Sequence, residues 1–166
     1  KADDVFIVDT NVWYWLAYTR ASQAVNPPAP YTSHYSRYIN SALGAGSKLL
    51  HSGLSLSELS HLIEKTEFEI FAQSNSAIFP DPKKFDKSFR HNPCHIRERA
   101  KTVSEIQAVW AQVSTLADSV DVRIDATTAA AALGRLNTEK VDGYDLYILE
   151  SMNASSIVRI ITNDGD

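Results

Sequence analysis

The stretch Val5-Phe6-Ile7-Val8-Asp9-Thr10-Asn11 decides the fold class of this chain. Its first four residues are apolar and mostly β-branched, which is typical of a strand that lies in a parallel sheet and is covered on both faces. The run ends at Asp9, and an apolar helical pattern begins at Val12, with Thr10 or Asn11 available as its N-cap. We therefore expect Asp9 at the carboxyl end of a central strand, where open α/β sheets bind ligands.

The rest of the chain predicts one α/β domain over residues 1–166. Apolar spacing predicts helices over 33–43, 55–73 and 97–117, an alanine-rich helix that Asp125 caps, and a helix that Asp142 caps. Strands are expected over 48–52, 120–124 and 157–162. The last strand should be buried. Residues 74–93 contain three prolines and mixed charge, which indicates a surface insert rather than core.

Composition excludes several classes of protein. The 166 residues are 44% hydrophobic and 22% charged, and no apolar run approaches the ~20 residues that span a bilayer, so we expect no membrane partner. The single cysteine, Cys94, excludes an intramolecular disulfide framework. Because Lys1-Ala2-Asp3-Asp4 also lacks the apolar core of a signal peptide, we expect a cytoplasmic protein.

Several acids occupy positions that ask for an explanation. Asp145 precedes Ile148 and Leu149 by three and four residues, so a helix would direct this carboxylate toward the core. Asp164 follows the last predicted strand as Asp9 follows the first. Glu58 has two explanations, because Ser55-Leu56-Ser57-Glu58 matches a capping box, yet the carboxylate could also serve a site at the sheet edge.

These carboxylates can converge at one end of a parallel sheet. At an effective dielectric of about 20, two carboxylates ~5 Å apart repel by roughly 3 kcal/mol, so such a cluster must bind protons or cations. Oxygen ligands favour Mg²⁺ or Mn²⁺. Zinc is disfavoured because His91, Cys94 and His95 lack a nearby fourth ligand. A carboxylate-held Mg²⁺ suits phosphodiester hydrolysis.

The motifs also resemble those of the PIN domain ribonucleases, particularly the VapC-type toxins of toxin–antitoxin pairs. The resemblance rests on Val8-Asp9-Thr10-Asn11, on Glu58, on Asp145-Leu146-Tyr147-Ile148-Leu149, and on Ile161-Thr162-Asn163-Asp164. It implies a three-layer α/β/α fold with a central, mostly parallel sheet, and a helical insertion at about 67–95 that compact members lack. The implied metal-binding acids are Asp9, Glu58, Asp145 and Asp164, with Asp166 supplementary and Asn11 or Thr162 in a supporting, hydrogen-bonding role.

The resemblance predicts a metal-dependent endoribonuclease that acts on single-stranded or structured RNA. It also implies a cognate antitoxin protein and is compatible with a homodimer. The alternative is a catalytically inactive PIN-like module that binds RNA or protein. A phospho-accepting receiver domain is disfavoured, because no lysine follows the last predicted strand.

Charge predicts where RNA would bind. The net charge is −4, but residues 83–101 carry seven Lys and Arg against Asp86 and Glu98. A basic segment in an otherwise acidic chain can bind phosphates. We expect Lys83, Lys84, Lys87 and Arg90 to guide RNA, the alternative being a merely solvated surface.

Overall fold

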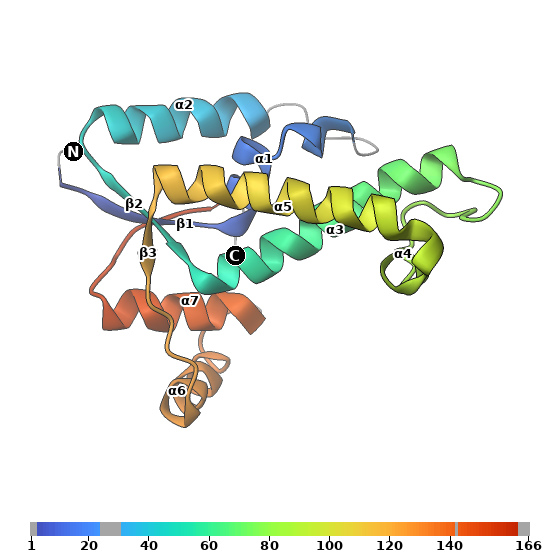
Figure 1. Ribbon diagram of the computed structural model, residues 1–166. Coiled ribbons are helices and arrows are strands. Elements are labelled where there is room, and N and C mark those ends of the chain that lie inside the picture. The colour runs from blue at the N-terminus through green and yellow to red at the C-terminus, as the bar shows by residue number, and fades with distance from the viewer. Residues whose placement is uncertain (1–2, 24–30, 142, 163–166) are drawn as a thin grey trace.

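The fold is built on a small parallel sheet. The computed structural model describes residues 3–23, 31–141 and 143–162 (Figure 1). Its four strands are β1 (Val5–Val8), β2 (Lys48–Ser52), β3 (Asp118–Val120) and β4 (Ile160–Ile161), and they lie in the order β3-β2-β1-β4. All pairs are parallel, with Ile7 opposite Leu50 and Val8 opposite Ile161. The predicted α/β class with a parallel sheet is confirmed.

Helices cover both faces of this sheet, as the apolar run of β1 predicts. Val8 belongs to a core shared with α1 (Thr10–Ala17), α2 (Tyr31–Gly44), α3 (Gly53–Ser74) and α5 (Ile96–Leu116). Its neighbour Ile7 points the other way and packs with Ile148 and Met152 of α7 (Gly143–Ala154). Figure 1 shows α2 and α7 on opposite sides of the strands. Because successive side chains of a strand alternate between faces, one four-residue strand joins both cores.

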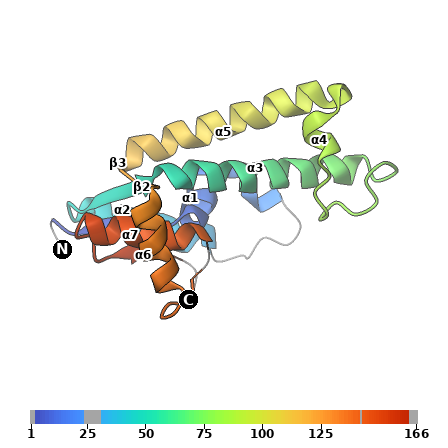
Figure 2. The ribbon, with the colours of Figure 1, turned by 90° about the horizontal axis from the view of Figure 1, so that it is seen from below.

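A long helical hairpin extends past the sheet. Helices α3 and α5 lie side by side, and their far ends are joined through α4 (Ser88–His91) and η2 (Pro93–His95) (Figures 1 and 2). This hairpin tip has a core of its own, in which Phe68 is fully buried and lies 5.3 to 5.5 Å, between ring centroids, from Phe79, Phe85 and Phe89. The prediction that residues 74–93 contribute no core is therefore wrong for Phe79 and Phe89.

Several of the remaining elements agree with the sequence, including β2, which has the bounds of the predicted strand 48–52. The predicted helices over 33–43 and 97–117 match α2 and α5 within two residues. Helix α6 (Ala126–Arg135) is capped as expected, since Thr128 N donates to Asp125 Oδ1 over 2.9 Å. A short 3-10 helix, η1 (Thr19–Gln23), follows α1. None of the described helices is both long enough and apolar enough to cross a membrane.

Two strand predictions are wrong in extent. Residues 121–125 are irregular and Ile124 is 59% exposed, although alternation predicts a strand over 120–124. The expected buried strand over 157–162 contains only the two residues of β4, and Val158 is 86% exposed. Among the described strands, β3 and β4 lie at the two edges of the sheet, where the apolar pattern carries less information about pairing.

Candidate functional site at the carboxyl edge of the sheet

Asp9 lies at the carboxyl end of β1, as predicted, and its backbone is held firmly. Asp9 N donates to Ile161 O over 2.9 Å, and Asp9 O accepts from Val12 N and Trp13 N over 3.1 and 3.2 Å. Asp9, rather than Thr10 or Asn11, occupies the N-cap position of α1, yet its carboxylate makes no capping hydrogen bond to the described helix. Only 6% of the residue is exposed. A buried carboxylate that does not cap its own helix is a strong candidate for a site residue.

Thr162 connects Asp9 to the neighbouring strand. It follows β4 directly, and its Oγ1 donates to Asp9 Oδ2 over 2.9 Å. This is a hydrogen bond of the kind that the PIN resemblance implies for Thr162, and it fixes the rotamer of the carboxylate. Asn11 lies half-buried in the first turn of α1. The functional roles of both residues stay predictions.

The capping explanation of Glu58 is wrong. Helix α3 begins at Gly53, and its N-cap is Ser52, whose Oγ accepts from Ser55 N over 3.3 Å. Ser55 therefore lies in the first turn of α3, and Glu58 lies in the second turn, beyond the reach of a capping box. The chain has two overlapping serine patterns, and the earlier serine caps the helix. Glu58 is half-buried, and its other explanation, a role in the site, remains.

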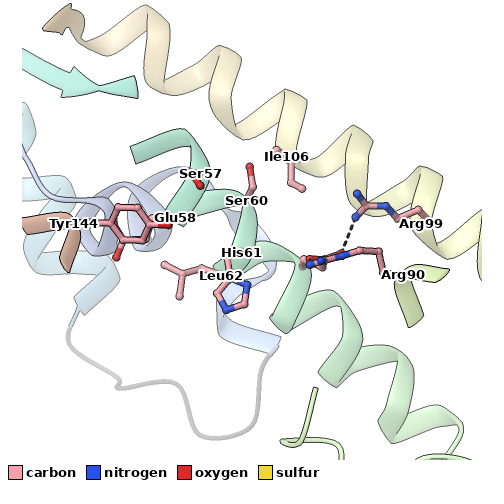
Figure 3. A pocket seen from close by; sticks show the side chains of 10 residues that line it. Ser57, Glu58, Ser60, His61, Leu62, Arg90, Arg99, Ile106 and Tyr144 are labelled. Atoms are coloured by element: carbon pink, nitrogen blue, oxygen red, sulfur yellow. Dashed lines mark hydrogen bonds and ion pairs between the residues drawn. The ribbon is translucent and has the colours of Figure 1, made fainter. Parts of the chain in front are cut away.

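Glu58 and the start of α7 share a cavity of about 620 Å³. The cavity lies between α3 and α5, with contributions from α4 and α7 (Figure 3). Its lining residues are Ser57, Glu58, Ser60, His61, Leu62, Glu64, Arg90, Arg99, Ile106 and Tyr144. Asp145 directly follows Tyr144, is half-buried, and lies in the first turn of α7. The fold thus brings the regions around Glu58 and Asp145 to one edge of the sheet.

The described acids provide only part of the expected metal site. Within residues 3–23, 31–141 and 143–162, no three His, Cys, Asp or Glu side chains lie close enough together to hold a metal ion. Asp164 and Asp166 lie outside the described residues, as does Asp142, the expected cap of α7. The donor set of Asp9, Glu58 and Asp145 still fits Mg²⁺ by its chemistry, because this ion uses one or two carboxylates and keeps several waters.

The four cations expected to guide RNA do not all line one cavity. Arg90 lines the cavity beside Glu58, whereas Lys84 and Lys87 line a separate cavity of about 480 Å³ at the hairpin tip. Lys83 is exposed on the same tip. Sequence reasoning placed Arg99 in the basic segment but did not select it, although Arg99 lines the cavity with Arg90.

A buried glutamate holds these two arginines in place. Glu64 is 4% exposed and was not selected from the sequence. It accepts from Arg90 Nε over 2.9 Å and from Arg99 Nη1 over 2.8 Å, and its second oxygen pairs with Arg90 Nη2. Burial raises the pKa of Glu64, but the hydrogen bond from Arg90 and the charges of both arginines outweigh it and hold that pKa below its ordinary value. Apolar spacing does not single out Glu64, because the residues three and four positions away are Ser60, His61, Glu67 and Phe68.

The geometry therefore shows a buried aspartate at a strand end, and a cavity that has two glutamates and two arginines in its wall. The likeness to PIN domains rests on the four motifs and their order along the chain. No family model, no curated protein and no solved structure matches this chain.

Proposed function

We propose that this protein is a PIN-like, Mg²⁺- or Mn²⁺-dependent endoribonuclease. The observation that carries the proposal is Asp9, a buried carboxylate at the carboxyl end of β1 whose rotamer is fixed by Thr162. Ligand sites of open α/β sheets lie at this edge. The cavity that joins Glu58 to the start of α7 supports the same location.

The proposed cation would be held by Asp9, Glu58, Asp145 and Asp164, with Asp166 as a further acid. When bound, it would activate water and stabilise the leaving oxygen of a phosphodiester. The chain's own contribution is positional. Thr162 donates to Oδ2 of Asp9 and so orients that carboxylate for the proposed cation.

A catalytically inactive PIN-like module is the second candidate. One observation favours it: three acids that could share a metal ion are not found in the described part of the chain. An inactive module would bind RNA or a protein without cleaving it. A cognate antitoxin and a homodimer are partners that the VapC resemblance implies or allows, and both remain proposals.

One cleavage experiment separates the two candidates. The full chain is incubated with a mixed single-stranded RNA and Mn²⁺, and in parallel with EDTA. We expect internal cleavage products in Mn²⁺ and intact RNA in EDTA. Intact RNA in both samples, from a protein whose circular dichroism shows it folded, would reject the nuclease and favour the binding module.

A further inference from the structure

The cavity beside Glu58 has chemically different ends. Figure 3 shows Tyr144 and Glu58 toward one end of the cavity, and Arg90 and Arg99 toward the other. Glu58 and Glu64 are six residues apart on α3, which is a rise of about 9 Å along the helix. A phosphate bound by the arginines is therefore not the phosphate bound at the acid site.

The arginine end is suited to an anion. Glu64 neutralises one of the two cations, so the three side chains together keep one positive charge. The side chains of Arg90 and Arg99 are 39% and 38% exposed, and each guanidinium has five donors, of which Glu64 engages only some. Because a buried carboxylate fixes both groups in advance, a phosphate that binds them need not order two flexible side chains.

The other end is suited to a base. Tyr144 is 46% exposed, although its ring lines the cavity. Nucleic-acid bases stack on such rings in single-strand binding proteins. The volume of about 620 Å³ lies within the range of roughly 300–1,000 Å³ that encloses a drug-sized ligand, so the cavity is large enough for one nucleotide.

From this arrangement we infer that the cavity binds an unpaired nucleotide of single-stranded RNA beside the cleaved bond. Its base stacks on Tyr144, and a flanking phosphate binds Arg90 and Arg99. A paired base inside a helix is already stacked and cannot enter such a cavity, which selects single-stranded over duplex RNA. The inference rests on the proposed function for the identity of the acid site, but binding itself requires no metal.

The test measures binding without cleavage. Fluorescence anisotropy of a labelled single-stranded RNA is recorded in EDTA over a series of salt concentrations. Arg99→Ala is the main variant, because Arg90 keeps its two contacts with Glu64 and the hairpin stays intact. We expect weaker binding and a log–log salt slope that is smaller by about 0.7, the loss of one phosphate contact to a single strand.

Arg97→Ala is the matched control. Arg97 lies on the same helix, two residues away, and lines a different cavity beside Glu67. Arg97→Ala removes the same charge as Arg99→Ala, but outside the proposed cavity. The inference therefore requires that the salt slope of Arg97→Ala stays closer to the wild-type slope than that of Arg99→Ala. Tyr144→Ala should weaken binding about fivefold or more, whereas Tyr144→Phe keeps the ring and the affinity.

Two results would overturn the inference. One is an equal effect of Arg99→Ala and Arg97→Ala on the salt slope, and the other is equal binding of single-stranded and duplex RNA of the same sequence. Failure of the proposed nuclease looks different, because RNA would then bind as described in EDTA but stay intact in Mn²⁺. If the wild-type protein cleaves RNA in Mn²⁺ but Arg99→Ala binds RNA as well as wild type, the nucleotide cavity is rejected and the nuclease proposal stands.

Discussion

At the scale of single residues, Asp9 combines burial with a fixed orientation. Its backbone belongs to the start of α1, and its carboxylate accepts from Thr162. We predict that Asp9→Asn lowers the cleavage rate in Mn²⁺ by at least about 100-fold, because the neutral amide binds the cation poorly. The fold should survive, since asparagine has the same shape and its amide oxygen can still accept from Thr162. Initial cleavage rates and melting curves of both proteins check this.

Asp125→Asn provides the matched control for that variant. Asp125 is also an aspartate at a helix N-cap, but it is exposed and its carboxylate caps α6. Asparagine is an equally good N-cap residue, so both stability and cleavage should stay near wild type. Near-normal cleavage by Asp9→Asn would remove Asp9 from the site, whatever the control shows.

Glu58 and Ser52 allow the capping and site roles to be measured separately. Ser52→Ala removes the cap of α3 and should lower the free energy of unfolding by about 0.5–2 kcal/mol, with cleavage retained by the folded protein. Glu58→Gln should do the reverse, with strongly reduced cleavage and a loss of stability below about 0.5 kcal/mol. Urea unfolding and cleavage assays of both variants distinguish the capping role from the site role. The opposite pattern would restore the capping role that the sequence suggested for Glu58.

At the scale of elements, the ion pairs of Glu64 with Arg90 and Arg99 connect α3 to α4 and α5. They should make the stability of the protein depend on pH. The pKa of Glu64 is lowered in the folded protein, so its contribution is present above the ordinary value of about 4.3 and is lost as the pH falls through the lower folded value. We predict that Glu64→Gln is less stable than wild type by about 1–2 kcal/mol at pH 7, a modest figure because both arginines are half-exposed.

Urea unfolding at pH 7 and at pH 3 provides the measurement. The difference between wild type and Glu64→Gln should be smaller at pH 3 than at pH 7, because acid below the ordinary pKa of glutamate protonates the unfolded chain more readily than the folded protein. Comparing the two proteins isolates Glu64 from Asp86, whose pKa is also lowered, chiefly by a hydrogen bond from the backbone of Ser88. A difference that stays the same at both pH values would mean that the ion pair adds nothing and that glutamine merely packs less well.

The elements also show what a single sequence can predict. Apolar spacing predicts helices α2 and α5, and the preference of aspartate for helix N-caps predicts that Asp125 caps α6. Both predictions succeed because both signals are local. Strand pairing is not local, so the strand at β4 was predicted too long, and the strand over 120–124 was predicted C-terminal to β3, with which it shares only Val120. The aromatic core of the tip was missed because prolines dominate that segment, although five of the six phenylalanines, all except Phe6, lie between residues 68 and 89.

At the scale of the whole molecule, the proposed substrate cavity lies where two parts of the fold meet. The sheet edge contributes Glu58 and Tyr144, and the extending hairpin contributes Arg90 and Arg99. The sequence motifs predict the acids, and the charge pattern selects Arg90, but nothing in the sequence places Arg99 beside it. The position of the two arginines depends on the packing of α3 against α5, which brings Glu64 to residues 26 and 35 positions away in sequence. The proposed choice of substrate therefore depends on tertiary packing rather than on a local sequence motif.

Metal binding should be visible as a change in the stability of the whole molecule. The proposed metal-binding acids lie far apart in the sequence and would form a site only in the folded chain. Mn²⁺ at 100 times its dissociation constant should therefore stabilise the protein by about 2.7 kcal/mol. For a chain of this length that raises Tm by roughly 5–11 °C. Melting curves with Mn²⁺ and with EDTA give the shift, and Asp125→Asn should show it in full.

Asp9→Asn should lose most of this shift, because it removes a charge that would bind the cation. In EDTA the same variant should melt no lower than wild type. The proposed site would then hold its carboxylates together without a cation, and removing one charge would relieve part of their repulsion. If Mn²⁺ leaves the wild-type Tm unmoved and Asp9→Asn melts lower in EDTA, then Asp9 stabilises the fold through Thr162 and holds no metal. The nuclease proposal would then lose its main physical support.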